Sequence, residues 1–174
     1  MEIVPLGLAH EAALLGFLKE FAASGETEID GYFGRSEWTH AETVAAFARW
    51  AKGEPPEGWV PSTTSFLVDE GRILGVSNLR YWLTLHLLEH GGHVGYSVRP
   101  SERSRGHATR LLRDAARKAR RLGIECLLVT CDASNAGSAR VIEKCGGILE
   151  SEAPIDEAAI RRYWIELRVR GRSL

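Results

Sequence analysis

Apolar residues recur at helical spacing in several stretches of this sequence, and short apolar or alternating runs lie between them. The helical spacing predicts one helix that ends near Ala23, a second that starts near Thr39, and a third that follows Gly106. A shorter helix is predicted over residues 135–145, where two glycines end it. The other runs predict strands, at residues 2–6, 64–70, 72–80, 93–98, 125–131 and 159–169.

The order of these elements indicates an α/β (α+β) fold with a single central sheet that is mixed, mostly antiparallel and flanked by helices on both faces. Its clearest part is a hairpin, because Asp69, Glu70 and Gly71 separate two strands and glycine accepts the positive φ of a tight turn. A chain of 174 residues is long enough to bury one core, and no linker or repeat divides it. We therefore expect a single domain over residues 1–174.

Composition and charge exclude several function classes. The net charge of −1 and the pI near 6.6 argue against a general nucleic-acid binder, which usually has a strongly basic domain. Cys126, Cys131 and Cys145 are odd in number and lie in apolar or helical surroundings, as expected of reduced thiols. The sequence shows no signal peptide and no apolar run that would span a membrane. We therefore predict a cytoplasmic protein with no nucleic-acid and no membrane partner.

Basic residues are concentrated in one segment, between Arg99 and Arg121. This segment holds nine Lys and Arg against two acids, whereas the whole chain has 22 basic and 23 acidic residues. Along its helix the arginines lie opposite the apolar stripe, which is the ordinary pattern of a solvated face. The preceding loop differs, because Arg103, Arg105 and Gly106 stand where the chain enters the helix. Free N–H groups and the positive end of the helix dipole predict a phosphate site there.

This loop and a later helix resemble a known pair of motifs. Residues 98–108, Val-Arg-Pro-Ser-Glu-Arg-Ser-Arg-Gly-His-Ala, are similar to the coenzyme A signature of the GNAT superfamily of acyl-CoA N-acyltransferases, where an apolar strand end and a proline precede Arg/Gln-x-x-Gly-x-Gly/Ala. Residues 135–147 resemble the family's second coenzyme A helix, which asparagine opens and a Glu-Lys-x-Gly run closes. The order of elements also fits, so the resemblance covers nearly the whole chain.

The resemblance implies the GNAT fold, in which two central strands splay apart, and an acetyl-CoA-dependent N-acetyltransferase. It implies acetyl-CoA as cosubstrate, no metal, and a primary amine on a small molecule or peptide as acceptor. The residues that it assigns to coenzyme A are Val98, Arg103, Ser104, Arg105, Gly106, His107, Ala108, Asn135 and Ser138. A homodimer is possible. The alternative function is that of a non-catalytic acyl-CoA-binding sensor or regulatory module.

The sequence departs from the family at the group that protonates the departing thiolate. Many members carry a tyrosine on the second coenzyme A helix, and the matching residue here is Ile142. Tyr96 is the first alternative, because strand alternation places it with Val94 and Val98 on the face that reaches the acceptor in the family. Tyr163 is the second alternative. Both tyrosines also suit a packed core with a satisfied hydroxyl.

Other polar residues leave alternatives open. Glu28 and Asp30, in the loop between the first two helices, suit a cationic amine acceptor. The alternative is that they are ordinary solvated acids of a surface loop. His93 or Glu89 is a base only if the strand is rotated from the expected register. The histidines around Glu89 match no common metal-ligand spacing, which disfavours a metal site. Cys131 is expected to be an inert core thiol.

Overall fold

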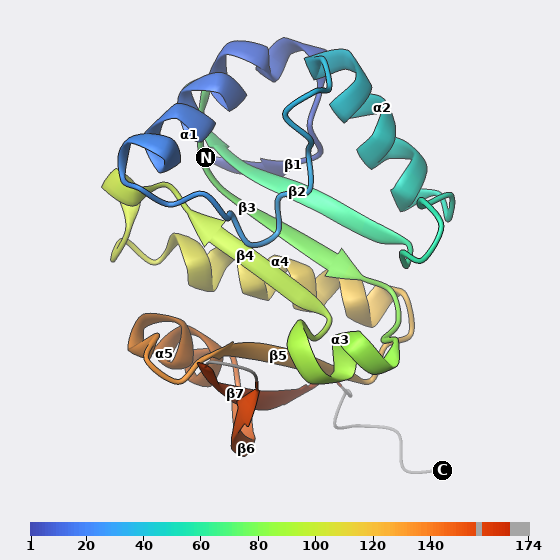
Figure 1. Ribbon diagram of the computed structural model, residues 1–174, viewed down its shortest axis with the longest axis vertical. Coiled ribbons are helices and arrows are strands. Elements are labelled where there is room, and N and C mark those ends of the chain that lie inside the picture. The colour runs from blue at the N-terminus through green and yellow to red at the C-terminus, as the bar shows by residue number, and fades with distance from the viewer. Residues whose placement is uncertain (156–157, 168–174) are drawn as a thin grey trace.

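The computed structural model describes residues 1–155 and 158–167 of the chain. Figure 1 shows α1 and α2 on one side of a twisted sheet, the long α4 across its other side, and α5 beside a further group of strands. The elements, in chain order, are β1 (Glu2–Val4), α1 (Glu11–Ala23), α2 (His40–Ala51), β2 (Ser62–Asp69), β3 (Arg72–Arg80), α3 (Leu85–His90), β4 (Val94–Val98), α4 (His107–Arg121), β5 (Cys126–Asp132), α5 (Ala136–Lys144), β6 (Gly147–Ile155) and β7 (Ala158–Glu166).

The predicted helices and the predicted hairpin are confirmed. Helix α2 begins with a capping box, in which the Thr39 side chain accepts from the Glu42 N–H and the Glu42 carboxylate accepts from the Thr39 N–H at 2.7 Å. The pair satisfies two donors that a helix start leaves free. The hairpin turn has φ of 46° at Glu70 and 74° at Gly71, as a tight turn between antiparallel strands requires.

The sequence pattern does not predict two elements, α3 and β6. The short α3 begins at Thr84, whose side chain accepts from the Leu87 N–H. Strand β6 lies at a sheet edge, where proline is tolerated and no continuous apolar face is needed, and it contains Pro154. Its acids pair with arginines of β7, Glu152–Arg161 at 2.7 Å and Glu150–Arg162 at 2.8 Å. Residues 168–169, predicted as the end of the last strand, lie outside the described residues.

The central sheet is divided between β4 and β5. Its hydrogen-bonded strands follow the order β1-β2-β3-β4 in one part and β5-β7-β6 in the other, and each of these pairs is antiparallel. His93 joins the two parts, because its N–H donates to the Leu128 carbonyl at 2.7 Å and its Nδ1 accepts from the Leu128 N–H at 3.0 Å. Beyond this contact the residues of both strands line one pocket. The predicted sheet is therefore present with the splayed central strands that the resemblance implies.

Apolar side chains attach helices to both faces of this sheet. Helices α1 and α2 pack on β2 and β3, with Phe17, Phe47 and Phe66 buried between them. Helix α4 packs on β3 and β4, and α5 packs on β5 and β6, around a core that includes Leu112 and Leu127. Burial of each such side chain contributes about 1.5–3 kcal/mol to the stability of the fold, so the apolar face of every helix packs against the sheet. In the described residues no helix is long and apolar enough to cross a membrane.

Candidate active site

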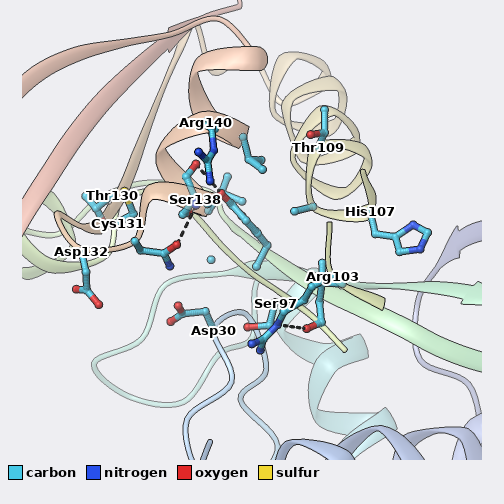
Figure 2. Close-up of a pocket in the computed structure, with 18 of the residues that line it drawn as sticks. Asp30, Ser97, Arg103, His107, Thr109, Thr130, Cys131, Asp132, Ser138 and Arg140 are labelled. Atoms are coloured by element: carbon cyan, nitrogen blue, oxygen red, sulfur yellow. Dashed lines mark hydrogen bonds between the residues drawn. The ribbon is translucent and has the colours of Figure 1, made fainter. Parts of the chain in front are cut away.

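A pocket of about 700 Å³ opens where β4 and β5 diverge. Residues of β4, of the end of β5, of the N-terminal part of α4 and of α5 line it (Figure 2). The loop between α1 and α2 adds Glu26, Glu28 and Asp30 to its wall. Cations come from the end of β3, from the loop before α4 and from α5: Arg80, Arg103, Arg140 and Lys144. The pocket is therefore polar, with charges of both signs.

The loop before α4 presents backbone donors to this pocket. Ser104 and Gly106 have φ of 62° and 82°, and no side chain caps the helix that follows. Within the described residues, the N–H groups of residues 104–109 donate no hydrogen bond to the protein. A Cβ at Gly106 would meet no protein atom within 4 Å, so this residue faces open space. Free N–H groups in a row at a helix N-terminus fit a phosphate or diphosphate group.

The two arginines of this loop point in different directions. Arg103 lines the pocket, where Nη2 pairs with the Glu26 carboxylate at 2.6 Å and Nε donates to the Val98 carbonyl at 3.3 Å. The Arg105 side chain does not line this pocket, and its Nη1 pairs with the buried Glu102 at 2.9 Å. Arg105 therefore offers the site its backbone N–H, and its role in coenzyme A binding stays a prediction.

The other residues predicted to bind coenzyme A all lie at the pocket: Val98, Ser104, Gly106, His107, Ala108, Asn135 and Ser138. Of these, His107 has its side chain buried, with Nε2 3.8 Å from Glu102 Oε2. Figure 2 shows this imidazole pointing away from Ser138. His107 therefore offers the pocket its backbone N–H rather than its ring.

Tyr96 and Ser138 form a hydroxyl pair on the pocket wall. Tyr96 Oη and Ser138 Oγ are 2.7 Å apart, which links β4 to α5. Asn135 starts α5, since its Oδ1 accepts from the Ser138 N–H at 2.9 Å, and this contact holds Ser138 in place. Burial raises the pKa of Tyr96 above its usual range. At neutral pH the Tyr96 hydroxyl therefore keeps its proton and remains a donor.

Tyr163, the second candidate acid, does not reach the pocket. Its side chain is 1% exposed in the core around α5, β5 and β7, and its Oη lies 3.5 Å from Glu143 Oε1. Its side chain is buried because helices α4 and α5 cover this face of β7, with Leu112 and Ala139 in the same cluster. Ile142, which stands where a helix tyrosine was expected, is fully buried in the same core. Of the two predicted tyrosines, only Tyr96 lies at the pocket.

Carboxylates from two separate elements line the pocket. Asp30 comes from the loop between α1 and α2 and Asp132 from the end of β5, and in Figure 2 the Asp30 carboxylate points to the side on which Asp132 lies. Burial raises the pKa of Asp30, Arg80 lowers it, and the charges of Asp132 and Glu28 raise it again. Asp30 nevertheless stays accessible to solvent on the pocket wall. This arrangement suits a cation and a carboxylate that accepts a proton.

Three further groups are poorly suited to accept a proton. His93 uses Nδ1 to accept from the Leu128 N–H, and burial together with Arg80 lowers its pKa to about 4. Glu89 lies exposed on α3 and does not line the pocket. Cys131 lines the pocket, but burial raises the pKa of its thiol, so the protonated form dominates at neutral pH. The structure therefore does not support His93 or Glu89 as the base.

The pocket contains several residues that the sequence pattern did not predict. Arg80 and Asp132 belong to no local motif, because the pairing and divergence of the strands bring them here. Arg140 and Lys144 could have been identified from the sequence, because residues four apart share one face of the helix that follows Asn135. That spacing would have predicted cations beside the phosphate site.

A comparison with known protein families and sequences gives one match. The family model for the acetyltransferase (GNAT) domain matches residues 5–148. No curated protein matches the chain in sequence.

Solved structures share the fold over almost their whole length. A protein described as an acetyltransferase, YncA from Salmonella typhimurium with its cofactor acetyl-CoA, is 15% identical with a TM-score of 0.67, over 96% of this chain and 94% of that chain. An N-acetyltransferase from Staphylococcus aureus Mu50 is 18% identical with a TM-score of 0.67, over 96% and 98%. A ribosomal-protein-alanine N-acetyltransferase from Brucella melitensis is 14% identical with a TM-score of 0.65, over 95% and 99%.

Proposed function

Since this chain belongs to the GNAT acetyltransferase family, we propose that it transfers the acetyl group of acetyl-CoA to the primary amine of a small-molecule or peptide acceptor. The pocket between β4 and β5 carries this proposal. It combines a phosphate-binding loop, a protonated hydroxyl and a pair of carboxylates within one cavity. These groups can place the cofactor, protonate the departing thiolate and accept a proton from the acceptor amine.

The phosphate-binding loop fits the diphosphate of coenzyme A. The free N–H groups of residues 104–109 would hold its oxygens, and Arg103 adds a positive charge beside them. Glu26 already orients the Arg103 guanidinium, so little side-chain freedom is lost on binding. Strand β4 ends its part of the sheet, and its unpaired edge would bind the pantetheine arm through main-chain bonds.

The hydroxyl pair and the carboxylates would handle the protons. The thioester supplies the acetyl group, and a C–N bond forms while the C–S bond breaks. Asp30 would accept a proton from the acceptor ammonium, because its raised pKa makes it a stronger base than an ordinary aspartate. Tyr96 would donate its proton to the departing thiolate. The second proton, which the nitrogen loses as the tetrahedral intermediate collapses to the amide, would reprotonate Tyr96 by relay through the Ser138 hydroxyl, 2.7 Å away, and Asp30 would release its proton to solvent.

Thiol release from acetyl-CoA with a panel of primary amines tests this function. We expect release that depends on the amine, and a melting temperature that rises with acetyl-CoA, because a ligand that binds only the folded state stabilises it. A thermal shift without thiol release from any amine would favour the acyl-CoA sensor. Neither signal at saturating acetyl-CoA would contradict both functions.

Tyr96→Phe tests the proposed acid. We expect kcat to fall about 10- to 100-fold, the low end of what a positioned acid contributes, while acetyl-CoA affinity is retained. Steady-state kinetics and a binding titration measure the two quantities. Tyr163→Phe is the matched control, because its hydroxyl lies in the core, and it should keep the parent kcat. If both variants keep full kcat, catalysis here uses no tyrosine as acid.

A further inference from the structure

Arg80, the last residue of β3, is held rigidly at the pocket. Its Nη1 donates to the carbonyls of Gly91 and Gly92, at 2.9 Å and 3.0 Å, in the turn after α3. Its guanidinium carbon lies 5.5 Å from the centre of the Phe33 ring. The residue lines the pocket. Two carbonyls and an aromatic ring therefore set the direction of the guanidinium before any ligand binds.

Part of this guanidinium has no partner within the protein. Among the described residues, Arg80 Nε and Nη2 donate no hydrogen bond, and no carboxylate lies within the 4.0 Å of an ion pair. Partial burial makes a missing partner costly, because the charge has lost some of its water. A planar guanidinium with free N–H groups matches the geometry of a carboxylate, which binds it through two hydrogen bonds.

Two glycines bring this guanidinium next to the reacting groups. A Cβ at Gly95 would lie 3.0 Å from the Gly31 nitrogen and 3.7 Å from Arg80 Nη2. Gly31 has φ of 84°, and a Cβ there would lie 2.6 Å from the Gly95 carbonyl oxygen. The loop that carries Asp30 can therefore pack directly on β4 beside Arg80. Tyr96 follows Gly95 on β4 with its side chain on the opposite face of the strand. Both faces border the same pocket, which Asp30, Arg80 and Tyr96 all line.

The carboxylates in this region complement the guanidinium. In the part of the chain that the structure describes, the side chains of Asp30 and Asp132 accept no hydrogen bond and form no ion pair within 4.0 Å. Their like charges repel, which a cation between them would relieve. The region thus offers free sites for one cation and one anion, on groups that line the same pocket.

We propose that the acceptor is an α-amino acid, whose carboxylate binds Arg80 and whose amine lies between Asp30 and Asp132. This inference rests on the acetyl transfer proposed above and names its acceptor class. A simple alkylamine or a polyamine leaves the guanidinium without an anion. The N-terminus of a peptide presents a neutral amide at that position, which accepts weaker hydrogen bonds than a carboxylate.

Matched acceptors test this class directly. The assay measures thiol release from acetyl-CoA with glycine, L-alanine, L-serine, L-leucine and L-phenylalanine, each beside its decarboxylated amine, and with L-leucinamide and spermidine. We expect kcat/KM for at least one amino acid to exceed that of its matched amine by at least about 10-fold, as a charge-assisted bidentate contact contributes. L-leucinamide should behave like isoamylamine rather than like L-leucine.

Variants of Arg80 assign the preference to the guanidinium. In Arg80→Gln the ratio of kcat/KM between amino acid and matched amine should fall toward one, and Arg80→Lys should restore part of it. Arg49→Gln is the control, because Arg49 lies exposed on α2 and pairs with Glu54, and it should keep the parent ratio. A residue that only supports the turn after α3 would lower both rates equally and leave the ratio unchanged.

The outcomes separate this inference from the function on which it rests. Amine-dependent thiol release without any preference for the carboxylate, or with a preference for L-leucinamide or spermidine, overturns the amino-acid acceptor and leaves acetyl transfer standing. A ratio unchanged in Arg80→Gln overturns the role of Arg80. No thiol release with any acceptor overturns acetyl transfer and the amino-acid acceptor together.

Discussion

Gly106→Asp is expected to weaken acetyl-CoA binding by more than about 100-fold, which corresponds to about 2.7 kcal/mol. Gly106 lines the pocket with φ of 82°, and a Cβ there would point into open space next to the free N–H groups before α4. A carboxylate at this position would face the diphosphate, and like charges placed together cost several kcal/mol. Titration calorimetry with acetyl-CoA measures the loss.

Gly106→Asn separates the effect of charge from that of shape. Asn and Asp both accept left-handed backbone and both are good residues at a helix start, so both variants are expected to fold. Their melting temperatures without ligand check this point. The Asn variant adds bulk alone and should lose less affinity than the Asp variant. If the Asp variant binds acetyl-CoA as tightly as the parent, the diphosphate site lies elsewhere.

Acid is expected to remove about 3 kcal/mol of stability through His93 as the pH falls from 7 to 4. Burial and the charge of Arg80 lower the folded pKa of His93 to about 4, against about 6.5 in an unfolded chain. Between these values the unfolded state binds the proton and the folded state does not, so the contribution of His93 decreases as pH falls through this window. Protonation would also remove the lone pair that accepts from the Leu128 N–H.

His93→Gln tests this assignment, because the amide oxygen of glutamine accepts a hydrogen bond and does not titrate. Urea unfolding at a series of pH values should show the variant less stable than the parent at pH 7, with a gap that narrows toward pH 4. His86→Gln is the control, because His86 lies exposed on α3, and its curve should run parallel to that of the parent. Parallel curves for His93→Gln and the parent would contradict the prediction.

The phosphate-binding loop was predictable because its determinants are neighbours in the chain. Gly106 and the residues around it set the backbone conformation locally, and the helix that follows supplies the dipole whatever packs against it. Side-chain directions in the same loop were not predictable. Arg103 and Arg105 are two residues apart, yet Glu26 draws one toward the pocket and Glu102 draws the other away. Glu26 is 77 residues from Arg103 in the chain, so no local pattern indicates that pair, whereas Glu102 stands only three residues before Arg105.

The two tyrosines predicted as acids also show which features a local pattern predicts and which depend on tertiary packing. Strand alternation predicted that Tyr96 shares a face with Val94 and Val98, which is a local property, and all three residues line the pocket. Tyr163, the second alternative, lies in the core because side chains of α4 and α5 cover its face of β7. That packing joins distant segments of the chain, so no local pattern indicates it.

The sequence by itself determined helices α1, α2, α4 and α5, the hairpin, the phosphate-binding loop and the family, since each depends on spacing along the chain or on a local motif. Only the tertiary structure decided which side chains meet in the pocket. Arg80, Asp30 and Asp132 come from three separate segments of the chain, and the Tyr96 hydroxyl of β4 contacts the Ser138 hydroxyl of α5. The gap between β4 and β5 exists because His93 joins the two strands at one point and they diverge from it. Contacts of this kind depend on sheet register and strand order, which no short stretch of sequence contains.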